Sequence, residues 1–75
     1  MKQNLEMYRK QRMHEIATNL RHIRSRVGWT QEQVAEHLGF SRAHVNRVEQ
    51  GRTEFSVAEL EVLAQAFNVP LSDLI

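Results

Sequence analysis

Hydrophobic side chains recur along the chain with the three- and four-residue spacing of α-helices. In the first third, four aliphatic residues fall on one helical face, namely Ile16, Leu20, Ile23 and Val27. The face continues upstream, less regularly, through Leu5, Tyr8 and Met13. The pattern therefore predicts a long first helix that starts well before Ile16 and ends at Gly28.

The stretch from Thr30 to Gly51 predicts two short helices separated by a glycine. One apolar face carries Val34, Ala35 and Leu38, and the next carries Val45 and Val48. Gly39 between them suits the left-handed backbone by which a chain often leaves a helix. Thr30 is placed to cap the first of these helices in a capping box with Gln33, and Ser41 is placed to cap the second. Such a pair is typical of a helix-turn-helix, whose second helix enters the major groove of DNA.

The last third predicts more helix and no strand. Ser56 and Glu59 form a second capping-box pattern, and the apolar face that follows consists of Val57, Leu60, Leu63, Ala64 and Phe67. Asn68 suits a left-handed stop, and Pro70 can precede a short last helix over residues 71–75. Five helices with short links predict an all-α bundle. We expect one domain over residues 15–75 and an N-terminal extension over residues 1–14, either as more of the first helix or as an arm.

Composition excludes several classes of function. The 75 residues include no cysteine, so neither a disulfide framework nor a thiolate metal site is expected. The four histidines, at positions 14, 22, 37 and 44, form no pair four residues apart and have no clustered carboxylates. There is no glycine-rich phosphate loop, nucleophile motif or pair of catalytic carboxylates. We therefore expect no enzyme, metal or cofactor.

The sequence also indicates where the protein is located. No apolar run approaches the roughly 20 residues that span a bilayer, and the N-terminus lacks a signal-peptide core. A cytoplasmic protein without a membrane partner is therefore expected.

The net charge of +1 hides a gradient of charge along the chain. Residues 1–27 hold seven basic and two acidic residues, whereas residues 53–75 hold four acidic and none basic. Residues 28–52 hold equal numbers of basic and acidic residues and have no net charge. Positive charge that attracts an anionic partner would therefore come from the first helix. The alternative is that the basic residues of this helix are simply solvated.

Residues 20–75 contain a set of residues whose types and spacing match those of a known family. The set comprises Gly28-Trp29-Thr30-Gln31, Val34-Ala35, Leu38-Gly39, Ser41, Val45, Asn46, Glu49, Gly51, Leu60, Leu63, Ala64, Phe67 and Leu71. It resembles the lambda-repressor/Cro type of helix-turn-helix domain, also called the xenobiotic-response-element family of bacterial and phage regulators. The resemblance implies a compact five-helix bundle whose second and third helices read DNA.

The resemblance and side-chain chemistry together suggest contacts with DNA. Base contacts are expected from Arg42, Ala43 and Arg47, with Arg42 suited to guanine and Ala43 to a thymine methyl or a close approach. Backbone contacts are expected from Thr30, Gln31, Ser41, His44, Asn46, Gln50 and Arg52, with Thr53 and Ser56 as weaker candidates. The resemblance also implies a structural ion pair between Arg24 and Glu49, although Arg24 as a phosphate contact is an alternative.

The function expected is that of a transcriptional regulator, a repressor that occupies a palindromic operator as a homodimer. It would be encoded by a bacterium or phage and act at the nucleoid. One alternative is an antitoxin that binds both a toxin and DNA, and another is a protein-interaction domain without DNA binding. A protein partner would be a toxin or an anti-repressor. Two surfaces can dimerise, one formed by Leu5, Met7 and Tyr8 and the other by Leu71, Leu74 and Ile75. Residues 1–14 can instead be frayed, or reach along DNA with Lys2, Arg9, Lys10 and Arg12.

Overall fold

The computed structural model describes residues 4–75, in which every regular secondary-structure element is a helix. The elements are α1 (Leu5–Arg26), α2 (Gln31–Leu38), α3 (Arg42–Glu49), α4 (Val57–Phe67) and the 3₁₀ turn η1 (Leu71–Asp73). The predicted all-α bundle is confirmed, and so is the extension of the first helix at its N-terminus. Lys2, a candidate DNA contact, lies outside the described residues.

The short last helix predicted over residues 71–75 is present only as η1, a 3₁₀ turn of three residues, so the structure has four α-helices in residues 4–75. Pro70 precedes η1 and offers no side-chain cap. The amides of Asp73 and Leu74 bond three residues back, to the carbonyls of Pro70 and Leu71. A segment this short makes too few bonds to offset the cost of starting an α-helix, so it adopts the tighter turn.

The helices begin at the capping residues that the sequence predicts, and the structure adds one further capping residue. Thr30 with Gln33 and Ser56 with Glu59 form the two expected capping boxes, and Ser41 accepts a bond from the amide of His44. The addition is Asn4, whose side chain accepts bonds from the amides of Glu6 and Met7 and so begins α1 at Leu5. Gly39 and Asn68 end α2 and α4 in the left-handed conformation, at φ 77° and 58°.

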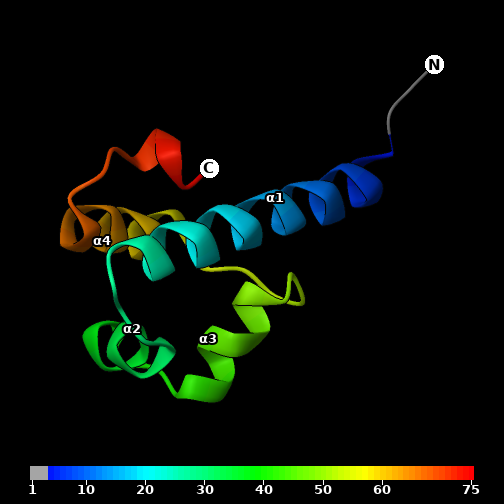
Figure 1. Cartoon of the computed structure of the whole chain (residues 1–75). Coiled ribbons are helices and arrows are strands. Elements are labelled where there is room, and N and C mark those ends of the chain that lie inside the picture. Colours follow the sequence, from blue (N-terminus) through cyan, green and yellow to red (C-terminus); the bar gives the residue numbers. More distant parts are fainter. Residues whose placement is uncertain (1–3) are drawn as a thin grey trace.

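The core lies between α1, the α2–α3 pair and α4. After α4, the C-terminal segment of the chain returns to lie beside α1 (Figure 1). Its buried members are Leu20, Ile23, Val34, Ala35, Val45, Val48, Phe55, Leu60, Leu63, Ala64, Phe67 and Leu74. Four residues of the predicted apolar faces are instead exposed: Leu5 and Tyr8 in α1, Val27 directly after α1, and Val57 at the start of α4. Phe55 is a core residue that helical spacing did not indicate, because it lies in the loop between α3 and α4.

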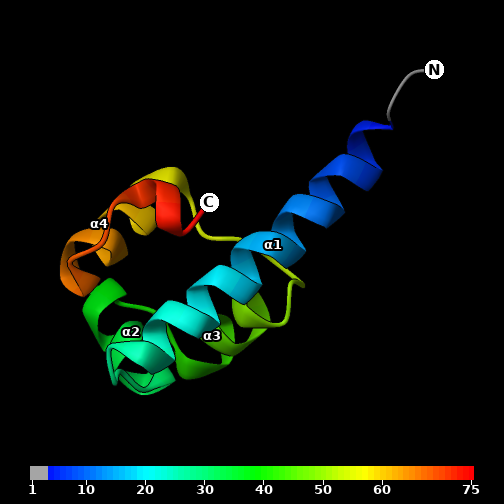
Figure 2. The same cartoon turned by 45° about the horizontal axis from the view of Figure 1, so that its top comes forward.

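The N-terminal half of α1 projects beyond the rest of the bundle, as both views show (Figures 1 and 2). Its apolar side chains Leu5, Met7 and Tyr8 are exposed. Within residues 4–75, no helix is both long and apolar enough to cross a membrane.

Candidate nucleic-acid interface

The α2–α3 unit is held at its turn by backbone bonds and by small or apolar side chains. Gly39 takes the left-handed conformation, and the amide of Phe40 donates to the carbonyl of Ala35 at 2.8 Å. Ala35 is buried, and Val45 and Val48 turn the inner face of α3 into the core. Burial of those two valines leaves the opposite face of α3 open to solvent.

That open face carries all three residues for which base contacts are predicted. Arg42, Ala43 and Arg47 are exposed, and Gln50 follows them on the same side. Together with Gln31 and Asn46, the first two line a shallow groove between α2 and α3. The structure thus brings Arg42, Ala43 and Arg47 together on one face of one helix.

Glu49, the one acidic residue of α3, is buried and so does not contribute to this exposed face. Its side chain is only 1% exposed and accepts hydrogen bonds from Arg24 of α1, at 2.6 Å from Nε and 3.0 Å from Nη2. Arg24 also donates from Nη1 to the carbonyl oxygen of Trp29 at 2.7 Å, and Arg21 donates to the backbone carbonyl of Glu49. The predicted partners therefore lie together, and the negative charge of α3 is paired inside the protein.

Gln31 joins the same network from α2. Its amide nitrogen Nε2 lies 3.0 Å from Oε1 of Glu49 and 3.1 Å from Oδ1 of Asn46. The amide N–H groups are the only donors of a glutamine side chain, so a phosphate would have to compete with these internal bonds. The sequence pattern gave no sign of this link between α2 and α3.

Two of the predicted backbone contacts, Thr30 and Ser41, also cap helices. Each hydroxyl oxygen accepts a bond from an amide three residues on, that of Gln33 at 3.0 Å and that of His44 at 3.2 Å. A hydroxyl that accepts in this way keeps its proton free to donate. Both residues are exposed, so their chemistry allows a cap and a phosphate contact together.

His44 lies in an aromatic cluster at the end of the core. Its ring centroid is 4.6 Å from that of Phe40 and 5.8 Å from that of Phe55, and the two phenylalanines stack on each other at 5.8 Å. The half-buried imidazole thus packs against the turn and the α3–α4 loop. Helical spacing could not have revealed this cluster, because Phe40 and Phe55 both lie outside the helices.

The remaining candidates lie on the loop after α3. Gln50 and Arg52 are exposed, and Thr53 is half-buried. Ser56, a weaker candidate, caps α4 by accepting a bond from the amide of Glu59 at 3.1 Å. Arg52 thus extends the exposed polar surface of α3 along the loop.

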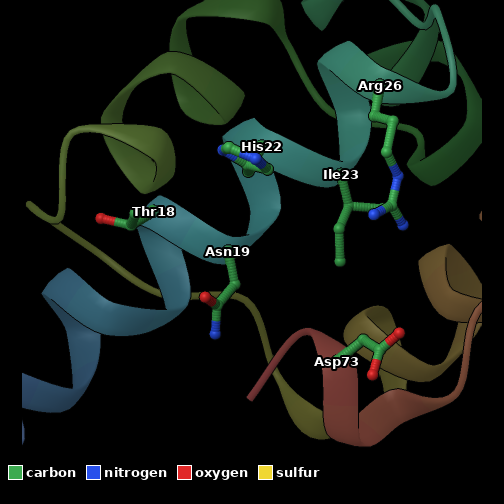
Figure 3. Close-up of a pocket in the computed structure, with 6 residues that line it drawn as sticks. All are labelled: Thr18, Asn19, His22, Ile23, Arg26 and Asp73. Atoms are coloured by element: carbon green, nitrogen blue, oxygen red, sulfur yellow. The ribbon is translucent and has the colours of Figure 1, made fainter.

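Other features of the described chain lie apart from this interface. Among residues 4–75, no group of three or more metal-binding side chains comes together. A hollow of about 310 Å³ lies between α1 and η1. Its lining residues, drawn in Figure 3, are Thr18, Asn19, His22, Ile23, Arg26 and Asp73. Arg24 lies on a different side of α1, where it contacts α3, so this hollow is separate from the open face of α3.

Comparison with known proteins supports the fold. The chain is 38% identical over 60 residues to the competence pilus inhibition repressor of Acinetobacter baylyi, a match that covers 80% of this chain and 54% of that protein. It is 35% identical over 60 residues to the uncharacterized HTH-type transcriptional regulator y4dJ of Sinorhizobium fredii, with 78% of that protein covered. The crystal structure of the restriction-modification controller protein C.AhdI from Aeromonas hydrophila is similar with a TM-score of 0.76 and 28% identity, over 87% of this chain and 98% of that one.

The extent of these matches differs. This chain spans about half the length of the Acinetobacter repressor, but almost the whole of the Aeromonas controller is matched. A model of a family described as "helix-turn-helix domain" matches residues 15–74, which include the α2–α3 unit. The resemblance to helix-turn-helix regulators is confirmed, and the chain belongs to this helix-turn-helix domain family.

Proposed function

We propose that this chain is a sequence-specific, double-stranded DNA-binding regulator that acts as a repressor by occupying an operator. One observation carries the proposal. The open face of α3 presents Arg42 and Arg47 to solvent, while Glu49, the acid of this helix, is buried against Arg24. A helix that shows two guanidinium groups and no carboxylate on its outer face is suited to the negative potential of a major groove.

The positions of the side chains along α3 support different contacts with DNA. Arg42 is the first residue of the helix, where side chains reach deepest toward base edges, and its guanidinium can donate two bonds to guanine. Ala43 adds only a methyl group, which permits a close approach or contacts a thymine methyl. Arg47 lies one turn further along the same face, within reach of a base or a phosphate.

Backbone phosphates are contacted from the edges of the unit in this proposal. Thr30 and Ser41 donate their free hydroxyl protons, while Gln50 and Arg52 contact phosphates from the end of α3 and the loop. Gln31, His44 and Asn46 contribute mainly through the internal bonds and ring packing that hold α2 and α3 in position.

A homodimer on a palindromic operator completes the proposal. One recognition helix reads only a few base pairs, so two copies related by a two-fold axis are the usual solution. Exposed Leu5, Met7 and Tyr8 on α1 support this surface as the dimer interface. The surface of Leu71, Leu74 and Ile75 is a poorer candidate for the dimer interface, since Leu74 is fully buried within its own chain. The names and bacterial sources of two relatives, a repressor and a transcriptional regulator, support action on bacterial DNA.

Selection of bound duplexes from a random pool tests this function. The wild-type protein should enrich a palindromic motif, and Arg42→Ala should lose the preference at one position in each half-site, worth about 1–3 kcal/mol. Arg26→Ala is the matched control, because Arg26 is an exposed arginine that lines the separate hollow beside η1. A pool without enrichment would refute the function, and a motif unchanged by Arg42→Ala would refute only the assignment of Arg42.

A further inference from the structure

A second basic surface lies where the N-terminal half of α1 passes the loop that follows α3. The two segments form a groove whose walls carry Arg9, Lys10, Met13 and His14 from α1, and Gly51 and Arg52 from the loop. Both views show this part of α1 extending past the loop (Figures 1 and 2). The groove therefore adjoins the proposed DNA-binding surface at Arg52.

Close packing fixes the direction of α1 relative to that surface. Gly51 has φ of 74°, and a side-chain carbon built on it would lie 3.0 Å from Nδ1 and 3.6 Å from Cα of His14. The loop backbone thus lies directly against α1 at this point. Because the helix is continuous from Leu5 to Arg26, this contact and the core together set where Arg9 and Lys10 lie.

The groove is positively charged. Arg9, Lys10 and Arg52 contribute three cationic groups, and Glu6 at its edge contributes one carboxylate. Within residues 4–75, none of these three cations forms an ion pair. Arg9 and Lys10 are exposed, so both remain available to a ligand.

Arg12, the next basic residue along α1, differs from Arg9 and Lys10 in its contacts. Its Nη1 lies 2.6 Å from Oε1 of Glu15, and its Nη2 donates to the carbonyl oxygen of Ile75 at 2.5 Å. At about 100° of helical rotation per residue, position 12 lies about 60° from position 9 and about 160° from position 10, so Arg12 borders the face that lines the groove but does not line it. Arg12 is thus engaged with the protein itself, while Arg9 and Lys10 face the groove.

We propose that this groove binds the DNA backbone outside the bases contacted by α3, with Arg9 and Lys10 as phosphate-binding residues. The inference rests on the proposed function and extends its footprint. Guanidinium and ammonium groups bind phosphate oxygens by charge-assisted hydrogen bonds. The continuity of the groove with Arg52 and α3 favours flanking DNA as its ligand over an acidic protein segment. Residues 5–14 form about 15 Å of helix, enough to reach phosphates that the α2–α3 unit does not.

Binding measured against salt concentration tests the proposal. The probes are two duplexes that share the selected motif, one with about six extra base pairs on each side and one trimmed to the motif. On the long duplex, replacing both cations in Arg9→Gln/Lys10→Gln should reduce the salt slope by about 1.8, at 0.9 per phosphate contact. From 50 to 200 mM salt, the affinity of the wild type should then fall about 12-fold more than that of the variant.

The trimmed duplex and a matched variant make the result specific. On the trimmed duplex, the double variant and the wild type should have the same slope. Arg12→Gln removes one arginine from the same helix, and unlike its counterpart Arg9→Gln it should leave the slope on the long duplex unchanged. Circular dichroism should show wild-type helicity for each variant, because the replaced side chains are exposed or half-buried on the surface.

The results separate this proposal from the function on which it rests. A wild-type slope for Arg9→Gln/Lys10→Gln on the long duplex would overturn the phosphate site while leaving operator binding intact. An equal reduction on both duplexes would also overturn it, because it would indicate general attraction by net charge. Failure of the wild-type protein to select any duplex would instead refute the proposed function.

Discussion

Arg24 donates two hydrogen bonds to the carboxylate of Glu49, from Nε to Oε2 at 2.6 Å and from Nη2 to Oε1 at 3.0 Å. The pair joins α1 to α3 and is unequal in its access to water, since the side chain of Glu49 is 1% exposed and that of Arg24 is 17% exposed. It has two consequences. The orientation of α3 is fixed by a helix outside the α2–α3 unit, and the acid on α3 is kept away from its outer face.

Removal of Arg24 should therefore destabilise the fold strongly. Arg24→Met leaves a buried carboxylate without its cation and should lower the free energy of unfolding by about 3–5 kcal/mol. Glu49→Gln should cost less, because an amide oxygen can still accept from Arg24. Urea unfolding followed by circular dichroism measures both. A loss below about 1 kcal/mol for Arg24→Met would contradict a structural role for the pair.

A carboxylate in place of Gln31 tests the network in another way. Gln31→Glu removes the donor to Glu49 and sets two carboxylates against each other, so it should cost about 1.5–3 kcal/mol. Gln33→Glu in the same first turn is the control. There a carboxylate can keep the capping bond to the amide of Thr30 and should stabilise the helix start by about 0.3–1 kcal/mol. Equal effects of the two substitutions on thermal unfolding would show that the internal bond of Gln31 is unimportant.

The turn between α2 and α3 should tolerate Asn better than Ala. Gly39 has φ of 77°, and no atom lies within 4 Å of a side-chain carbon built on it, so only backbone strain opposes substitution. Gly39→Ala should lower stability by about 1–2 kcal/mol. Asn adopts the left-handed conformation more readily, so Gly39→Asn should lose less. Denaturant midpoints should rank Gly, Asn and Ala in descending order, and an Ala variant as stable as the wild type would disprove the strain argument.

Self-association should depend on the exposed apolar residues at the start of α1. Sedimentation equilibrium should show a reversible dimer for the wild type and a monomer for Leu5→Ser/Tyr8→Ser, because the interface loses its largest apolar side chains. Val57→Ser removes another exposed apolar side chain, at the start of α4, and should leave the dimer intact. A dimer lost through Ile75→Ser instead would assign the interface to the C-terminal end.

Helical spacing predicted the parts of this molecule that depend on local order. The inward valines at positions 45 and 48 determine which residues of α3 face outward, so the exposure of Arg42, Ala43 and Arg47 followed from the sequence. The contacts it missed join residues far apart in the chain. Gln31 meets Glu49, and Phe55 reaches Phe40 from an irregular loop, and neither contact has a periodic signature. The pairing of Arg24 with Glu49 was expected only through family resemblance, because no rule of spacing links α1 to α3.

Recognition of DNA sequence by α3 is tested most directly by the ratio of two dissociation constants. The wild-type protein is titrated with its selected duplex and with a scrambled duplex of equal length and composition, at one salt concentration. The selected duplex should bind about 10³-fold or more tightly than the scrambled one, and Arg42→Ala should reduce that ratio at least about fivefold. Equal affinity of the wild type for the two duplexes would contradict recognition of DNA sequence by α3.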